Sequence, residues 1–305
     1  MKKMKIFILV NIIVISICLI LFGSYNYFYS KKNIDDKINK ENNDTKILSV
    51  NNYSKNIDYE FVQITDNVTV KSYQDILNII YTTLDHGITE LAFYCDDNYT
   101  NCYNDVKKIM ANKNLLSAIN SFVHPFNEYK KIGITNNSDG TNNIFITKMY
   151  SDTDIDYINK KTNEIISDNI LDDMTSEEKI HIIHDYIINN TKFSYSKDDE
   201  NYTALGALLN GKCTDGGYSD LFSIIMSKLN IENFKVASDL HIWNAVYLDN
   251  RWLNVDVTWD DPVNIDDETE NSLIYDYYLV TADELLKTDN SNFMFDKTIY
   301  KEIFN

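Results

Sequence analysis

The chain has 305 residues, of which 44% are apolar and 13% aromatic, enough to build a packed core and to exclude an intrinsically disordered protein. This length has room for one large domain, or two modest ones, beside an anchor. The formal net charge of −18 argues against nucleic acid, or an anionic membrane surface, as the main partner.

The N-terminus predicts a membrane anchor. Three lysines lie within the first five residues and precede an apolar run over residues 6–22, close to the length that crosses a bilayer. The lysines favour a cytoplasmic tail over residues 1–5 and place the rest of the chain outside the cell. No small-residue cleavage site follows, and Ile17 stands before Cys18 where a lipoprotein signal has a small residue. An uncleaved, single-pass signal anchor over residues 6–28 is therefore favoured over a cleaved signal peptide, a lipoprotein or a buried helix.

Residues 29–57 are rich in Lys, Asn and Asp and poor in apolar side chains, which predicts a linker. Residues 58–152 predict a small mixed α/β domain. Its expected elements are strands at 59–65, 88–94 and 144–150, and helices at 72–85 and within 102–122. No motif for chemistry stands out there, so a substrate-positioning or spacer role is expected.

Residues 153–305 predict an α+β domain. A capping box, Thr175 with Glu178, opens a helix that ends near Asn190. The other expected elements are a helix from 154, a short helix at 202–209, a helix whose apolar stripe spans 218–229, and strands at 233–238, 241–248 and 251–257. Helices followed by an antiparallel meander are typical of the α+β class.

The cysteines divide by their surroundings. Six polar or turn-forming residues separate Cys95 from Cys102, so the two could form a local disulfide in an oxidising exterior. Cys18 lies in the apolar run, which leaves Cys213 alone. Cys213 precedes a predicted helix, whose positive N-terminal end favours the reactive thiolate. The alternative is a small buried residue that fills a tight turn.

The last two predicted strands bring a histidine and an aspartate together. Asp249-Asn250 between them suits a two-residue hairpin turn, which fixes the register. In that register His241 and Asp256 lie on one face of the hairpin as diagonal neighbours, within reach of each other. The Asp256 carboxylate can then orient the His241 ring and stabilise its charged form.

Residues 175–262 resemble the transglutaminase-like domain of the papain-like cysteine-enzyme superfamily, especially its bacterial branch. The segments that carry the resemblance are ALGALLNGKC (204–213), GYS (217–219), HIWNAV (241–246) and VDVTWDDP (255–262). The resemblance implies a papain-like core of helices packed on an antiparallel sheet. It also implies a catalytic triad: Cys213 is the nucleophile, His241 the general base and acid, and Asp256 the residue that orients His241.

One departure from the family pattern lies beside Cys213. The family places one residue between its cysteine and a Gly-Tyr pair, whereas three residues, including Asp215, separate Cys213 from Gly217-Tyr218 here. We expect the two extra residues to move Cys213 off the helix end into the preceding turn. We also expect the Asp215 charge to lie close enough to raise the pKa of the thiol.

Three aromatic residues are further candidates for the site. Tyr202 is a candidate second oxyanion donor beside the Cys213 backbone N–H. Trp243 and Trp259 flank the proposed site, where core packing is the default interpretation and the resemblance implies walls of a substrate groove.

No metal or other cofactor is expected. His181 and His184 lie three apart on a predicted helix and could share a metal, but no third ligand is evident. The acidic run at 266–268 lacks the spacing of a calcium loop and indicates a solvated turn.

These features predict a cysteine enzyme that transfers acyl groups through a thioester, acting on protein or peptide amides outside the cell. An amine acceptor would give cross-linking and water would give hydrolysis; cell-wall peptide is one candidate substrate. The alternative is a catalytically inactive module that keeps the fold and binds cell-surface protein or wall peptide. A third hypothesis is a metal-dependent hydrolase that uses His181 and His184.

Overall fold

The computed structural model describes residues 59–65, 68–137, 140–196, 198–262, 273–288 and 290–304. Apart from residues 63–65, the described residues belong to one compact unit. The predicted anchor and nearly all of the predicted linker, like the acidic run at 266–268, lie outside the described residues. Within the described part of the chain, no helix is both long enough and apolar enough to cross a membrane.

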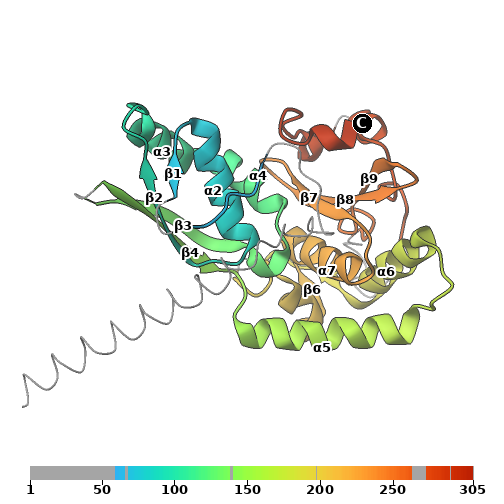
Figure 1. Ribbon diagram of the computed structural model, residues 1–305. Coiled ribbons are helices and arrows are strands. Elements are labelled where there is room, and N and C mark those ends of the chain that lie inside the picture. The colour runs from blue at the N-terminus through green and yellow to red at the C-terminus, as the bar shows by residue number, and fades with distance from the viewer. Residues whose placement is uncertain are drawn as a thin grey trace, which may run out of the picture. The chain divides into compact units, whose positions relative to one another are not determined.

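The first module, residues 68–150, is built on a four-stranded sheet with the order β1-β2-β4-β3 (Figure 1). β1 runs parallel to β2, and the other neighbouring strands are antiparallel, which agrees with the mixed α/β character predicted for this region. Its elements are β1 (Thr69–Val70), α2 (Tyr73–Asp85), β2 (Glu90–Cys95), α3 (Cys102–Ala111), α4 (Lys113–Ser121), a 3-10 turn η1 (Pro125–Asn127), β3 (Tyr129–Asn136) and β4 (Thr141–Lys148).

The predicted strand at residues 59–65 is wrong, since these residues form no regular element. Their backbone groups bind helix α2 instead of a neighbouring strand: the Glu60 N–H donates to Asn78 Oδ1 at 3.1 Å, and the Val62 N–H donates to Thr82 Oγ1 at 3.0 Å. The two aromatic residues of this segment pack on the same helix, where the Tyr59 and Phe61 rings stack on Tyr81. Side-chain acceptors on α2 thus replace the ladder that a strand would need.

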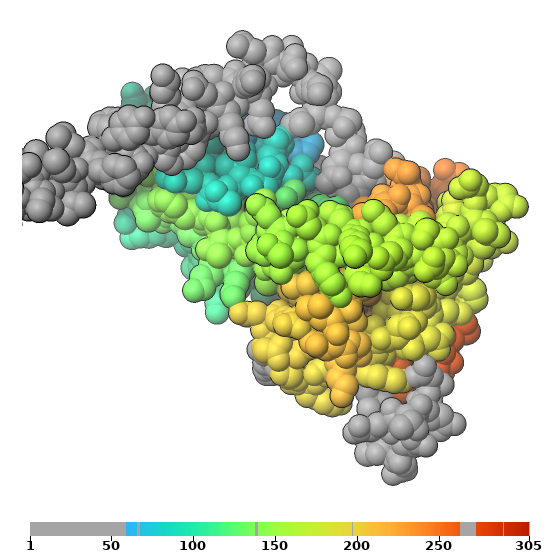
Figure 2. All heavy atoms as spheres, turned by 90° about the horizontal axis from the view of Figure 1, so that it is seen from below, coloured from blue at the N-terminus to red at the C-terminus, as the bar shows by residue number. Residues whose placement is uncertain are grey.

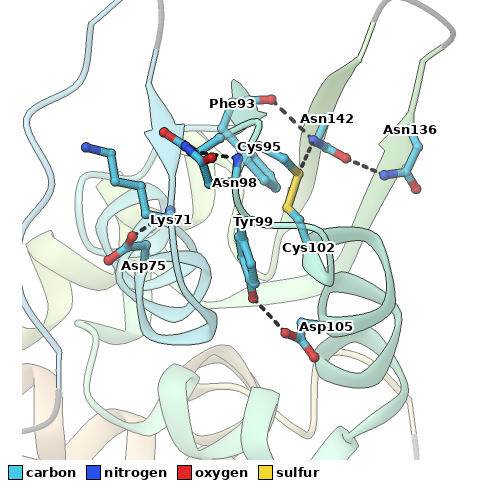
Figure 3. The surroundings of a disulfide bond; sticks show 11 residues. Lys71, Asp75, Phe93, Cys95, Asn98, Tyr99, Cys102, Asp105, Asn136 and Asn142 are labelled. Carbon is cyan, nitrogen blue, oxygen red and sulfur yellow. Dashed lines mark hydrogen bonds between the residues drawn. A yellow bond between two sulfur atoms is a disulfide. The ribbon is translucent and has the colours of Figure 1, made fainter.

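A disulfide joins the sheet of the first module to its helices. Cys95, the last residue of β2, is bonded to Cys102, the first residue of α3, with their Cα atoms 6.1 Å apart (Figure 3). This pairing is the one that their spacing predicts. From β4, Asn142 Nδ2 donates to the Phe93 carbonyl and to Cys95 Sγ, both at 3.5 Å.

The second module, residues 152–304, packs helices against a three-stranded antiparallel sheet, β7-β8-β9. Figure 1 shows α7 beneath that sheet, with α6 beside it and α5 along the bottom. The elements are α5 (Asp152–Asn169), α6 (Ser176–Asn190), β5 (Lys192–Phe193), a π-helical turn η2 (Gly206–Asn210), β6 (Lys212–Cys213), α7 (Asp215–Lys228), β7 (Asn233–Ala237), β8 (Ile242–Leu248), β9 (Arg251–Val255), α8 (Ala282–Leu286), η3 (Ser291–Phe293) and η4 (Lys301–Phe304).

Local signals set several of these boundaries. The predicted capping box begins α6, because Thr175 Oγ1 accepts the Glu178 N–H at 3.2 Å and Glu178 Oε2 accepts the Thr175 N–H at 2.8 Å. The short helix predicted at 202–209 is instead the π-helical turn η2.

On the face in Figure 2, α5 crosses between the blue-to-green residues of the first module and the yellow-to-orange residues of the later elements.

The β8–β9 hairpin has the predicted register, with Leu248 paired to Arg251. Its two turn residues, Asp249 and Asn250, both have positive φ, +50° and +64°. A two-residue turn of this kind needs left-handed backbone at both central positions, and Asp and Asn tolerate it better than most residues. This turn fixes which side chains meet at the far end of the hairpin.

Candidate functional site

His241 and Asp256 meet at the end of the β8–β9 hairpin opposite its turn. His241 directly precedes β8, Asp256 directly follows β9, and His241 Nε2 lies 2.6 Å from Asp256 Oδ2. The other Asp256 oxygen accepts the backbone N–H groups of Thr258 and Trp259 at 3.1 and 3.0 Å. The contact predicted from turn length and strand parity is therefore confirmed, and the carboxylate is fixed on both sides.

The other ring nitrogen of His241 also faces a carboxylate. His241 Nδ1 lies 3.0 Å from Asp215 Oδ2, which accepts the Ile242 backbone N–H at 3.2 Å as well. Asp215 is the first residue of α7, and its second oxygen accepts the Gly216 N–H at 2.9 Å. The partial positive charge at a helix N-terminus favours an anion at this position.

The two carboxylates keep His241 charged. Burial by itself lowers the pKa of this ring, but the charge of Asp256 and the hydrogen bonds and charge of Asp215 outweigh it and raise the pKa of His241 to about 10. At neutral pH both ring nitrogens then carry protons and donate to carboxylates. A general base needs a free nitrogen, so His241 cannot accept a proton in this state.

Cys213 lies two residues before α7, off the helix end, as the two extra residues predict. This residue lies in β6, paired with Phe193, and its side chain is fully buried in the core of the second module. Each ring nitrogen of His241 is bonded to a carboxylate, and within the described residues no hydrogen bond joins the Cys213 thiol to His241. Burial, and then the charges of Asp220, Asp215 and Asp261, raise the pKa of the Cys213 thiol well above its ordinary value. A reactive thiol has the opposite shift.

The departure in spacing explains which residue faces His241. A family cysteine, with one residue between it and the Gly217-Tyr218 pair, would stand at position 215, and in this chain that residue is an aspartate. The signal was present in the sequence, because the extra residues were expected to move Cys213 off the helix end. The sequence reasoning missed the other half of the outcome, that Asp215 itself occupies the position opposite the histidine.

The first turn of α7 lies tightly against its neighbours. A Cβ added at Gly217 would lie 2.4 Å from Cys213 Cβ and 2.7 Å from the Thr203 carbonyl oxygen. A Cβ at Gly216 would lie 2.8 Å from the Tyr202 carbonyl oxygen. The backbone of Tyr202 is therefore next to the site, and its ring is 40% exposed.

Aromatic rings surround His241. Trp243 is buried, its ring stacks on the His241 ring with the centroids 5.8 Å apart, and its Nε1 donates to Asn254 Oδ1 at 2.9 Å. Trp259 is only partly buried, and its ring lies edge-on to His241 at 6.2 Å. Phe293, which the sequence reasoning did not single out, lies edge-on at 5.9 Å. Trp243 thus belongs to the core, whereas Trp259 reaches the surface.

The two histidines of α6 both contact Asp185, with His181 Nε2 3.5 Å from Asp185 Oδ2. His184 is fully buried, with Nδ1 2.9 Å from Asp185 Oδ1 and Nε2 3.1 Å from Asp260 Oδ2. His181 is half-exposed and stacks on the Tyr275 ring. Across the described ranges, no three or more His, Cys, Asp and Glu side chains are grouped so that they could hold a metal ion.

Residues 164–257 match the family model of the transglutaminase-like superfamily. This stretch of the chain is similar to a transglutaminase-like domain. Domains of this superfamily usually belong to cysteine enzymes that transfer or hydrolyse acyl groups. The matched stretch includes Cys213, Asp215, His241 and Asp256.

Two solved structures are similar to the chain. The crystal structure of a TGase is 12% identical with a TM-score of 0.34, and the match covers 65% of this chain and 60% of that one. A candidate cysteine protease from Cytophaga hutchinsonii is 11% identical with a TM-score of 0.28, and the match covers 42% of this chain and 61% of that one. The chain thus spans about three fifths of the length of each. A comparison with curated protein sequences gives no match.

Proposed function

We propose that the transglutaminase-like domain of this chain works by binding, not by thiol catalysis, and that its partner is a protein or peptide outside the cell. One observation carries this proposal: the side chain opposite His241 at the start of α7 is the carboxylate of Asp215 and not a thiol. The inactive-module alternative that the sequence left open is therefore preferred over the Cys213 enzyme.

The chemistry of acyl transfer supports this choice. Formation of a thioester needs a thiolate within reach of the substrate carbonyl, and a histidine that can move the proton to the leaving amine. The Cys213 thiol is buried, its pKa is raised, and within the described residues no hydrogen bond joins it to His241. Attack by the Asp215 carboxylate on an amide would give an anhydride, which is far more reactive than the amide and hence unfavourable.

Exposed apolar side chains beside the site suit a binding surface. Leu240, next to His241, is 65% exposed, and Met294, next to Phe293, is 74% exposed. Tyr202, whose backbone carbonyl lies beside Gly216 at the start of α7, is 40% exposed, and we include it with Leu240 and Met294 in the proposed rim. Apolar side chains that remain in water around a polar centre are typical of an interaction site. The centre holds one imidazolium and two carboxylates and so has a net charge of −1, which suits a neutral or cationic partner group better than an anionic one.

Placement outside the cell, on a single-pass anchor over residues 6–28, is part of the proposal. The lysines before the apolar run support that orientation. The Cys95–Cys102 disulfide supports it as well, because disulfides persist in oxidising compartments and are rare in the cytosol. Cell-surface protein and wall peptide are the partners that such a location offers.

The first experiment measures incorporation of a labelled primary amine into a glutamine-containing protein, together with amide cleavage. We expect the wild-type chain and Cys213→Ala to give the same background rate. Turnover by the wild-type chain that Cys213→Ala abolishes would overturn the proposal in favour of the thiol enzyme. Turnover that a chelator stops would favour the metal-dependent hydrolase.

The second experiment tests the partner by co-sedimentation of the full-length protein with purified cell-wall sacculi. Leu240→Glu changes the rim, and Leu171→Glu is the matched control, since Leu171 is equally exposed but lies on the α5–α6 connection. We expect Leu240→Glu to lose binding and Leu171→Glu to retain it. Equal binding by both variants would exclude this rim as the binding surface.

A further inference from the structure

A buried polar network joins the two modules. Tyr150, which follows β4, donates its hydroxyl hydrogen to Asp220 Oδ2 on α7. The other Asp220 oxygen accepts from Lys235 Nζ on β7 at 2.6 Å, and Lys235 Nζ also donates to Glu128 Oε1 at the start of β3. All four side chains are buried. The first module thus contributes two of the four groups, Tyr150 and Glu128. Helix α7, which begins at Asp215, is bound to that module through the hydrogen bond between Tyr150 and Asp220.

The Tyr150 hydroxyl has a second partner beside the candidate site. It accepts the backbone N–H of Ala204 at 2.9 Å. One hydroxyl therefore binds α7 through Asp220 and the segment 201–204 through Ala204. Buried hydroxyl groups with both a donor and an acceptor partner hold the two elements at a fixed separation.

The segment 201–204 packs directly on the first turn of α7. The Thr214 N–H donates to the Asn201 carbonyl at 2.8 Å, and the carbonyl oxygens of Tyr202 and Thr203 occupy the space that side chains at 216 and 217 would need. The position of the segment 201–204 therefore determines where the first turn of α7 lies. Asp215, the first residue of that turn, is the residue that bonds to His241.

We propose that Tyr150 is a positioning residue of the Asp215–His241 site, contributed by the first module. Its hydroxyl holds α7 and the segment 201–204 in the arrangement that brings the Asp215 carboxylate to His241 Nδ1. The first module is then a structural part of the site and not a spacer. This inference concerns the geometry of the site, so it stands whether or not the site binds the partner proposed above.

A second buried tyrosine supplies a matched control. The Tyr300 hydroxyl also joins the two modules, since it accepts the Ala237 N–H at 3.1 Å and donates to Ser121 Oγ at 3.2 Å. These bonds involve neither α7 nor the segment 201–204. Tyr300→Phe thus removes the two hydrogen bonds of a buried tyrosine hydroxyl, one of them between the modules, without touching the proposed link.

The test is the pKa of His241 in full-length protein labelled with 15N-histidine, followed by NMR between pH 5 and 10.5 and assigned with a His241→Gln variant. In Tyr150→Phe we expect the Asp215–His241 bond to loosen and the pKa of His241 to lie about 1 lower, a tenfold change in the protonation equilibrium. Both variants should lower the urea midpoint of unfolding, because each loses buried hydrogen bonds. Tyr300→Phe, however, should leave the pKa of His241 unchanged.

An unchanged pKa of His241 in Tyr150→Phe, or an equal decrease in both variants, would overturn the inference. If Tyr150→Phe does not fold, Gly216→Ala tests the same link, because its added Cβ would push the Tyr202 carbonyl away from α7. That variant should also lower the pKa of His241, and no change there would count equally against the proposal.

Discussion

Replacing Asp215 with cysteine should create the reactive thiol that the chain lacks. Asp215→Cys places sulfur at the first residue of α7, facing a histidine whose other nitrogen is already held by Asp256 at 2.6 Å. A thiol at a helix N-terminus beside an imidazolium has a pKa between about 3.5 and 7.5, against about 8.5 for a free thiol. We expect a value near the middle of that range, about 5.5.

The expected gain in alkylation rate follows from that pKa. At pH 6 a thiol with a pKa of 8.5 is about 0.3% thiolate and one with a pKa of 5.5 is about 76%, a ratio of roughly 200. The less basic thiolate is a weaker nucleophile, and a Brønsted coefficient of about 0.45 lowers its rate constant roughly 20-fold for this difference in pKa. The net expectation is alkylation by iodoacetamide about tenfold faster than that of a free thiol at pH 6.

The assay measures alkylation by iodoacetamide in a Cys213→Ala background, so that alkylation in the second module reports on the thiol at position 215. His241→Gln added to Asp215→Cys should return the rate and its pH profile to those of an ordinary thiol. The reasoning would be refuted by a thiol at position 215 that alkylates with an apparent pKa near 8.5, whether or not His241 is present. Gain of amine incorporation by Asp215→Cys alone would support the same geometry.

Three further predictions concern stability, each measured by urea unfolding. Burial and the charge of Asp220 raise the pKa of Glu128 to about 8, above its ordinary 4.5. The contribution of protonated Glu128 to the free energy of unfolding is therefore fully present below about pH 4.5 and is lost as pH rises through 8. Glu128→Gln should flatten that decline, and an unaltered pH profile would contradict it. His241→Gln leaves two carboxylates without their shared cation and should cost about 3 kcal/mol at pH 7. In the wild-type chain, the stabilisation by charged His241 is fully present below about pH 6.5 and disappears as pH rises through about 10. An equal cost of His241→Gln at pH 7 and at pH 11 would therefore contradict this prediction. Cys95→Ser opens a short disulfide loop and should cost about 2.5 kcal/mol. The stability of Cys95→Ser should then not change on reduction with dithiothreitol, whereas that of Cys213→Ser should fall, because Cys213→Ser keeps the Cys95–Cys102 bond.

Much of the fold could be predicted because its signals are local. The capping box at Thr175 begins a helix through bonds between residues three apart, and Asp249-Asn250 supplies the backbone conformation that a two-residue hairpin needs. The hairpin register then brings His241 to Asp256 although fifteen positions separate them in sequence. The predicted strand at 59–65 was wrong for the complementary reason. Its residues suit a strand, but side-chain acceptors on α2, 18 and 20 residues further along the chain, decide where its backbone binds.

The sequence by itself determined most of the elements, the disulfide and the histidine–carboxylate pair at the hairpin end. Only the tertiary structure decided which side chain completes that site. Cys213 and Asp215 are two positions apart, and the choice between them depends on where α7 begins against β8 and against the segment 201–204. That placement is set by packing and by buried polar contacts from elements far away in the chain, Tyr150 among them. The spacing between Cys213 and Gly217-Tyr218 indicates that the thiol is displaced from the helix end, but it does not show by itself that Asp215 bonds to His241.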